Sequence, residues 1–349
     1  MAEVARRTGV SVQTVSAVVN GKPGISEPTR VRIRQVIEEL DYQPNHAARL
    51  LRNRQSVTIG VIISSITNPF FPGIVQGIET VAREHGYIVI LCNDDADPSK
   101  RLAYLEALRQ QQVAGIIAAY GTPAPETDAS LRNCLARGIP VVLVSGHRLD
   151  DRAVTIHVDN RQGMASAVAY LIALGHRRIA MISPPDRTAP QRDRLAGFID
   201  AHTNAGLAHD PALVLPGGFG VEDGERAAER LVHGSADATA IVAANDLVAI
   251  GAIAALKRLG RRVPHDIAVV GYDDIPMSSL YDPPLTTVAQ PLAQLGAAAM
   301  RAILERAADR TLPGGMMHFG TRLVVRGSTA PPATRTDRPR SWTGRGAAP

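Results

Sequence analysis

The sequence predicts a protein with a small all-α head and a larger α/β body of two Rossmann-like lobes. Two observations favour this fold class. Continuous Val- and Ile-rich runs alternate with helical segments from residue 57 onward, which is typical of buried parallel strands covered by helices on both faces. Before residue 57, short segments with helical periodicity are separated by turn residues, which favours a small helical unit.

Charge is unevenly distributed along the chain, whose total is +5. Residues 1–55 carry nine Lys or Arg and five acidic residues, a net charge of +4. Residues 331–349 carry four Arg and one Asp, so residues 56–330 have a net charge of −2. A basic head on a slightly acidic body indicates that the head meets a polyanion. The simpler interpretation, a solvated charged face, remains open at this point.

The head begins with two short helices joined by a tight turn, in the stretch Ala5 to Val15. Ala5 is small enough for the second helix to cross closely, and Gly9 can adopt the positive φ that the turn requires. Ser11 is a good N-cap for the second helix. This is a helix-turn-helix pattern, although two packed helices with no special role would also show part of it.

In a helix-turn-helix the second helix lies in the major groove, and phosphate contacts come largely from elsewhere. The predicted second helix is uncharged, which suits base reading. Gln13 can pair with an adenine edge, while Val12 and Ala17 can touch thymine methyl groups. Thr14 and Ser16 supply hydroxyl groups that can bond to phosphates or bases. The N-cap Ser11 is also a candidate DNA contact.

A third helix should close the core of the head. Ser26 is a plausible N-cap, Pro28 is tolerated in the first turn, and the apolar stripe consists of Ile33, Val36, Ile37 and Leu40. Pro44 interrupts the chain after it. The basic stretch that follows has too little apolar surface to be a stable helix alone. It is either an ordinary linker or a helix that orders on DNA.

The body should contain two parallel sheets. Strands are predicted at 57–63, 87–93, 113–120 and 140–145 for the first sheet, and at 178–183, 240–245 and 267–273 for the second. Helical segments at 74–86 and 101–112 separate the first strands. Ligands of open α/β sheets bind beyond the carboxyl ends of the strands, so the residues that follow each strand are the candidates for a site.

The candidates for ligand contact are the polar and aromatic residues at these strand ends. An aromatic ring, an Arg, an Asn and an Asp that converge on one cleft suit a polyhydroxylated ligand, since the ring stacks on the apolar face of a sugar and the charged groups grip hydroxyl pairs. The predicted contacts are Asn68, Phe70, Phe71, Ser145, Arg192, Arg194, Phe219, Asn245 and Asp273.

Each candidate also has a structural interpretation. Phe70 and Phe219 are equally plausible as core residues, and Asn245 is a possible cap of the helix that follows it. Arg194 could instead form a structural pair with Asp193 or Asp273.

The sequence offers no enzyme or metal motif. Cys92 and Cys134 lie in separate apolar segments, and no His/Cys spacing suits a metal. The Asp273–Asp274 pair is on one loop, where adjacent carboxylates diverge, and the Gly-rich segment 217–220 lacks the Lys and Ser or Thr of a phosphate loop. No catalytic residue, metal or cofactor is therefore expected. Since neither a signal peptide nor a transmembrane run is evident, a cytoplasmic protein is expected.

Several motifs together resemble the LacI/GalR family of bacterial transcriptional regulators. They include "EVARRTGVSVQTVSAVVNG", "YQPNHAARLL", "IGVIISSITNPFF", "YLIALGHRRIAMI", "AANDLVAIGAIAAL" and "VPHDIAVVGYDDI", in order and at sensible spacing up to about Gly327. The resemblance implies a periplasmic-binding-protein fold whose chain crosses between lobes near Asp159, Ala289 and Gly320. The implied domains are a helix-turn-helix head at 1–44, a hinge helix and linker at 45–56, a first lobe at 57–158 and 290–319, a second lobe at 159–289 and 320–328, and a disordered tail at 329–349.

The resemblance also assigns roles to individual residues. The segment Asn45–Arg52 matches a hinge helix that enters the minor groove as a pair, with Leu51 as a wedge between bases; without the resemblance, Leu51 is merely apolar linker surface. DNA contacts are further expected from Asn20, Asn45 and Ala48. The effector contacts implied are Phe71, Arg194, Phe219, Asn245 and Asp273.

The chain departs from the family pattern in three places. Ser145 replaces an Asp that is common in the family, so one hydroxyl contact is expected to change. Ala17 replaces a frequent base-contacting Arg, so the operator half-site should differ at that base. Family members usually have a few residues more before the first helix, so the start of the chain is either assigned too late or shortened.

The leading hypothesis is a ligand-responsive transcriptional regulator, in most cases a repressor, that binds a palindromic operator as a homodimer and takes a sugar between its lobes. A sugar-binding receptor for transport is the alternative, against which the basic head argues. An enzyme on a Rossmann-like scaffold is the third interpretation, which the fold permits but no catalytic constellation supports.

Overall fold

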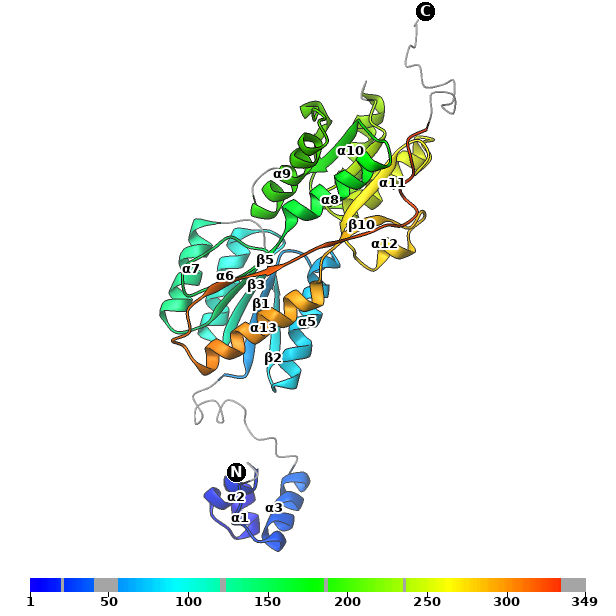
Figure 1. Cartoon of the computed structure of the whole chain (residues 1–349). Helices are drawn as coiled ribbons and strands as arrows, with labels where there is room; N and C mark the ends of the chain where they lie inside the picture. The colour runs from blue at the N-terminus through cyan, green and yellow to red at the C-terminus, as the bar shows by residue number, and fades with distance from the viewer. Residues whose placement is uncertain (20–21, 41–55, 120–123, 185–187, 235–236, 334–349) are drawn as a thin grey trace, which may run out of the picture. The chain divides into compact units, whose positions relative to one another are not determined.

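The structure, a computed structural model, describes residues 1–19, 22–40, 56–119, 124–184, 188–234 and 237–333 (Figure 1). The chain forms two compact units, Met1–Ser56 and Val57–Pro349. The predicted DNA contacts at Asn20, Asn45, Ala48 and Leu51 lie outside the described residues, as does the tail from 334 onward.

The head consists of α1 (Ala2–Thr8), α2 (Val12–Val19) and α3 (Glu27–Glu39). Val4, Val15 and Ile33, one from each helix, are fully buried at its centre. Gly9 ends α1 with a φ of 66°, the left-handed conformation that glycine adopts without strain. Ser11 Oγ accepts a hydrogen bond from the Thr14 backbone N–H at 3.1 Å. The predicted turn and N-cap are thus confirmed.

The cap expected at the start of α3 is only partly present. Ser26 stands at the N-cap position with extended backbone, but its side chain makes no capping hydrogen bond. Its hydroxyl is instead 2.9 Å from the hydroxyl of Thr29. The helix therefore begins where it was predicted to begin, but the expected capping hydrogen bond is absent.

The first lobe is a six-stranded parallel sheet in the order β11-β5-β4-β3-β1-β2. Its strands are β1 (Thr58–Ile63), β2 (Ile88–Asn93), β3 (Gly115–Ala119), β4 (Val141–Val144), β5 (Val154–Val158) and β11 (Gly315–Phe319). Helices α5 (Phe70–Glu84) and α13 (Leu292–Ala308) cover one face. The other face is covered by α6 (Pro98–Gln110) and α7 (Pro125–Ala136).

The second lobe repeats this plan with the strand order β12-β10-β9-β8-β6-β7. Its strands are β6 (Ile179–Ser183), β7 (Val214–Pro216), β8 (Ala240–Ala243), β9 (Ala268–Asp273), β10 (Thr286–Ala289) and β12 (Arg322–Val324), the last antiparallel to β10. Helices α8 (Asn160–Ala173) and α9 (Ala189–Asn204) cover one face. The other carries α10 (Val221–His233) and α11 (Asp246–Arg258), and the short α12 (Met277–Leu280) follows β9.

The chain passes between the lobes between β5 and α8, between β10 and α13, and between β11 and β12 (Figure 1). Two of these crossings are tied together, since the Asp159 backbone N–H donates to the Phe319 carbonyl at 2.9 Å. Residues at the carboxyl ends of the parallel strands in both lobes line a cavity between the lobes.

The body extends further along the chain than expected. The tail was predicted to begin at 329, yet the Thr329 hydroxyl is 3.0 Å from the Tyr170 hydroxyl, and His176 Nε2 is 2.9 Å from the Ala330 carbonyl. His176 is buried and also contacts the Thr239 hydroxyl, so it is a packing residue of the second lobe. The boundary at 328 was therefore wrong, because the Tyr170 hydroxyl holds Thr329 and the buried His176 holds Ala330.

None of the helices in the described ranges is long and apolar enough to cross a membrane.

Candidate functional site

A cavity of about 370 Å³ lies between the two lobes, at the carboxyl ends of their strands. Both lobes contribute walls, and most residues predicted from the strand ends line it. They are Asn68, Phe70, Phe71 and Ser145 from the first lobe and Arg194, Phe219, Asn245 and Asp273 from the second.

Arg192 does not belong to this set. It is exposed and absent from the cavity lining, where Gln191 stands instead. The reason is helical phase: residues two apart on a helix point in nearly opposite directions, whereas residues three apart share a face. On α9, Gln191 and Arg194 are both buried on the inner side, so the expected contact from Arg192 is corrected to Gln191.

Aromatic rings form the apolar part of the site. Phe70 and Phe71 are half-buried and meet edge to face, with ring centroids 5.0 Å apart and an interplanar angle of 84°. Phe219 is 48% exposed, too open for a core residue. These rings offer stacking surface to a flat apolar ligand face.

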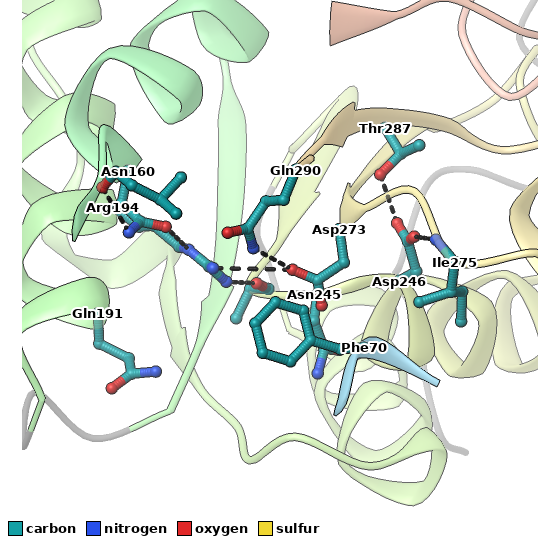
Figure 2. Close-up of polar contacts among 12 residues, drawn as sticks. Phe70, Asn160, Gln191, Arg194, Asn245, Asp246, Asp273, Ile275, Thr287 and Gln290 are labelled. Carbon is teal, nitrogen blue, oxygen red and sulfur yellow. Dashed lines mark hydrogen bonds and ion pairs between the residues drawn. The ribbon is translucent and has the colours of Figure 1, made fainter. Parts of the chain in front are cut away.

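Arg194 is the buried cation of the site. Its Nε donates to Asn160 Oδ1 at 2.9 Å, its Nη1 donates to the Ala244 carbonyl, and its guanidinium lies 3.8 Å from the centre of the Tyr272 ring. Figure 2 shows Arg194 and Asp273 pointing toward each other, with Arg194 Nη2 3.8 Å from Asp273 Oδ1. The predicted Asp273 pair thus exists, at the outer limit of an ion pair.

Asp273 is the buried carboxyl of the site, 4% exposed at the end of β9. Its φ of 114° lies in a region that non-glycine residues rarely adopt, a strain that is commonly found at ligand sites. Gln290 Nε2 donates to its Oδ1 at 2.7 Å. Burial raises the pKa of Asp273 to about 7, although Arg194 and the Gln290 hydrogen bond act to lower it.

Asp246 lies behind the site and was not singled out from the sequence. It is fully buried and accepts hydrogen bonds from the Ile275 backbone N–H at 2.8 Å and the Thr287 hydroxyl at 2.5 Å (Figure 2). The Ser278 hydroxyl donates a third bond at 2.7 Å. Burial raises the pKa of Asp246 to about 6, although these three hydrogen bonds act to lower it. Through Ile275 and Ser278, Asp246 therefore holds the segment that follows Asp273 in place.

Asn245 serves two structural purposes at the cavity wall. Its Oδ1 accepts the Val248 backbone N–H at 2.9 Å, which caps α11, and its Nδ2 donates to the Phe219 carbonyl at 3.0 Å. The capping interpretation is thus correct. It is compatible with a place in the cavity, because the same side chain also holds the segment that carries the Phe219 ring.

Replacing Asn245 with alanine is expected to lower the free energy of unfolding by about 1–2 kcal/mol, the usual loss for an N-cap. Asn245→Asp keeps the capping acceptor but not the donor to Phe219. It should therefore retain most of the stability while weakening ligand binding. Denaturant unfolding and ligand titration of both variants measure this, and equal destabilisation by alanine and aspartate would contradict the assigned division of roles.

The candidate nucleic-acid face of the head is the start of α2. Ser11, Val12 and Gln13 are exposed, while Thr14 and Ala17 are half-buried. Ser16 is only 7% exposed, so this conformation does not offer the contact expected from it. Arg6 and Arg7 are bonded to Glu3 within α1, where the two guanidinium groups hold the pKa of the Glu3 carboxyl down at about 2.

In the ranges that the structure describes, no group of three or more His, Cys, Asp or Glu side chains is placed to hold a metal ion. Cys92 and Cys134 are buried free thiols.

Two family models match the chain. Residues 1–45 match the model of bacterial regulatory proteins of the lacI family, and residues 168–329 match a periplasmic binding protein-like domain. The chain is 37% identical to the HTH-type transcriptional regulator MalR of Streptomyces coelicolor, covering 97% of this chain and 99% of that protein.

Solved structures give the same result. A lac repressor dimer bound to operator and the anti-inducer ONPF matches with a TM-score of 0.83 and 30% identity, covering 94% of this chain and 98% of that one. A complex of the transcriptional regulator CelR with cellobiose matches with a TM-score of 0.72 and 31% identity, covering 93% and 98%. The predicted fold class, a helix-turn-helix head on a periplasmic-binding-protein-like body, is confirmed.

Proposed function

The chain belongs to the lacI family of bacterial regulatory proteins and is a transcriptional regulator, and from this premise we propose that it is a sugar-responsive repressor. In this proposal the head binds a palindromic operator as part of a homodimer. A sugar occupies the inter-lobe cavity and changes the affinity for DNA. The protein acts by binding and not by catalysis, in the cytoplasm where its operator is accessible.

The observation that carries the proposal is the composition of the cavity. Arg194 and Asp273, both at least nine-tenths buried, face a space whose other walls include the Phe70, Phe71 and Phe219 rings. Buried charged groups next to accessible aromatic rings are what a ligand with hydroxyl edges and an apolar face requires. The CelR match, solved with cellobiose, supports the same ligand class.

The division of the chain is proposed accordingly. Residues 1–44 read DNA, 45–56 connect head to body, and the two lobes comprise 57–158 with 290–319 and 159–289 with 320–330. Because three chain crossings join the lobes, a ligand held by both of them can favour one relative arrangement. It can do so only to the extent that its affinity differs between the two arrangements.

The proposed DNA contacts are made by α2 and by the connecting segment. In the head they are Ser11, Val12, Gln13, Thr14 and Ala17. In the segments outside the described residues, Asn20, Asn45, Ala48 and Leu51 remain proposals, with Leu51 as the wedge that kinks the minor groove.

The direct test is retention of a DNA fragment from the promoter of the protein's own gene by the full chain. The measurement is repeated with cellobiose, D-ribose and other sugars at saturating concentration. Specific retention that one sugar changes by about fivefold or more is expected, since allosteric coupling is typically about 1–3 kcal/mol. Retention no stronger than that of random DNA would overturn the proposed operator binding.

Gln13→Ala should reduce affinity for the preferred operator by about 1–3 kcal/mol and relax base preference at one position. Gln13 is exposed at the start of α2 and has the longest side chain there that can bond to a base edge. Binding to operators mutated at each position, compared with random DNA, measures the effect. Arg34→Ala, which removes an exposed cation of α3, is the control. It should lower the affinity for DNA without altering the base preference. An equal loss on operator and random DNA for Gln13→Ala would contradict base reading.

A further inference from the structure

The hydrogen-bonding capacity of the cavity indicates which kind of ligand it takes. Among the lining residues that the structure describes, Arg194 is the only cation. Its Nε and Nη1 are engaged by Asn160 and the Ala244 carbonyl, and its ring-stacked guanidinium already faces Asp273. Two of its N–H groups are thus already engaged, and the two carboxyl groups of Asp273 and Asp95 that line the cavity disfavour an anionic ligand.

The unused groups of the cavity include an amide oxygen, which can only accept, and a hydroxyl, which can accept or donate. Gln191 Oε1 and Ser145 Oγ are buried and have no hydrogen-bond partner in the described part of the chain. Asp273 receives one short hydrogen bond, from Gln290. By contrast, the Asn245 and Asn68 side-chain oxygens are occupied by backbone N–H groups. The ligand must therefore bring donors, and since buried acceptors left unpaired are costly, hydroxyl groups meet the requirement without adding charge.

Burial of Asp273, which is only 4% exposed, and the nearby carboxyl of Asp246 favour a proton, while Arg194 and Gln290 favour the ionised form. Arg194 on α9 faces its carboxyl at 3.8 Å, Gln290 after β10 donates to it, and Asp246 on α11 adds a like charge. The other titratable groups nearby have partners of their own. Neighbouring Tyr272 is buried under Arg194, and Asp274 is paired with Arg326 at 2.6 Å. Asp95, across the cavity, is paired with Lys100 at 2.7 Å. Burial outweighs the single cation, so the pKa of Asp273 is raised to about 7.

We propose that a proton and an uncharged ligand with adjacent hydroxyl groups compete for the Asp273 carboxyl. In the empty site near neutral pH a proton occupies the carboxyl in part of the molecules. When the ligand binds, its hydroxyl groups donate to the ionised carboxylate, and the displaced proton leaves to the buffer. This inference rests on the proposed sugar site, and it specifies the ligand as neutral and its binding as dependent on pH.

The sign follows from the ionised form being the one that binds. With a pKa of about 7, ligand affinity should fall about tenfold for each pH unit below that value and should be constant above about pH 8. Affinity at pH 8 is therefore expected to be about tenfold higher than at pH 6. Asp273→Asn, which cannot ionise, should bind more weakly and show no such dependence.

The experiment is calorimetric titration of the full chain with cellobiose and D-ribose at pH 6, 7 and 8, in two buffers of different ionisation enthalpy. Release of close to one proton at pH 6 and almost none at pH 8 is expected. Asp274→Asn, the adjacent carboxyl that does not line the cavity, should keep the pH dependence. D-ribose 5-phosphate should bind more weakly than D-ribose. Binding without proton release at pH 6, or tighter binding of the phosphate, would overturn the inference.

A second measurement does not require a ligand. Because the folded pKa of Asp273 is raised, its contribution to stability is fully present below the unfolded pKa of about 4 and is lost as the pH rises through about 7. The unfolding equilibrium constant of the wild type should therefore rise relative to Asp273→Asn over this window. If neither sugar binds, the proposed sugar site is contradicted while this comparison still tests the proton. Parallel pH profiles would show that folding does not raise the pKa of Asp273 and would overturn the inference.

Discussion

Replacing Asp246 with alanine is expected to lower the free energy of unfolding by about 3–5 kcal/mol, the largest stability effect among the substitutions considered. The carboxyl is fully buried and accepts from the Ile275 backbone and from the Ser278 and Thr287 hydroxyls. Alanine would leave these donors without a partner in a dry interior. Each unsatisfied buried group costs about 1–3 kcal/mol, and local relaxation recovers part of the sum.

Denaturant unfolding of the full chain measures this loss, with Asp282→Ala as the matched control. Asp282 lies in the same lobe but its side chain is 93% exposed in a surface pair with Lys257, so its loss should cost less than about 1 kcal/mol. Asp246→Asn keeps one acceptor oxygen and should lie between the two. Equal midpoints for Asp246→Ala and Asp282→Ala would show that the buried network does not stabilise the lobe.

The sheets were predictable where strands are continuous apolar runs. The seven predicted strands correspond to β1–β4, β6, β8 and β9, which are almost wholly buried except for the edge strand β2. Five strands were missed. β5 and β10 are largely buried, but they are short and contain Thr or His, so neither is a continuous apolar run. β11 is an exposed edge strand with the sequence GMMHF, and β12 and β7 have only three residues each. The pairing of β11 and β12 also depends on where the chain crosses between lobes, which local periodicity does not encode.

The candidate site was predictable to the extent that it follows strand ends. Asn68, Ser145 and Asp273 fall there because parallel strands end at one edge of each sheet. Helix phase, which distinguishes Gln191 from Arg192, was readable from the buried spacing of Gln191, Arg194 and Phe198. Asp246 was not recognisable in the same way, since its partners Ile275, Ser278 and Thr287 lie about 30 to 40 residues away.

Removal of the Arg194 guanidinium should have the largest functional effect. Truncating one member of a buried charged pair typically costs about 2–5 kcal/mol. We therefore expect Arg194→Ala to weaken effector binding more than a hundredfold at about 3 kcal/mol. Without its counter-charge at 3.8 Å, Asp273 would also hold its proton more firmly. Arg194→Lys keeps the charge but not the planar fork that reaches Asn160 and Ala244, so an intermediate loss is expected.

The measurement is a pair of titrations for each variant, effector binding with and without operator and operator binding with and without effector. Arg194→Ala should bind operator like the wild type when no effector is present, and effector should no longer shift that affinity at wild-type concentrations. Arg192→Ala is the control, because this exposed neighbour on α9 does not line the cavity. Since coupling is reciprocal, the two titrations must report the same factor in the wild type. Wild-type effector affinity in Arg194→Ala would place the ligand elsewhere. Lost operator binding without effector would assign Arg194 to the fold of the lobe instead of to its ligand.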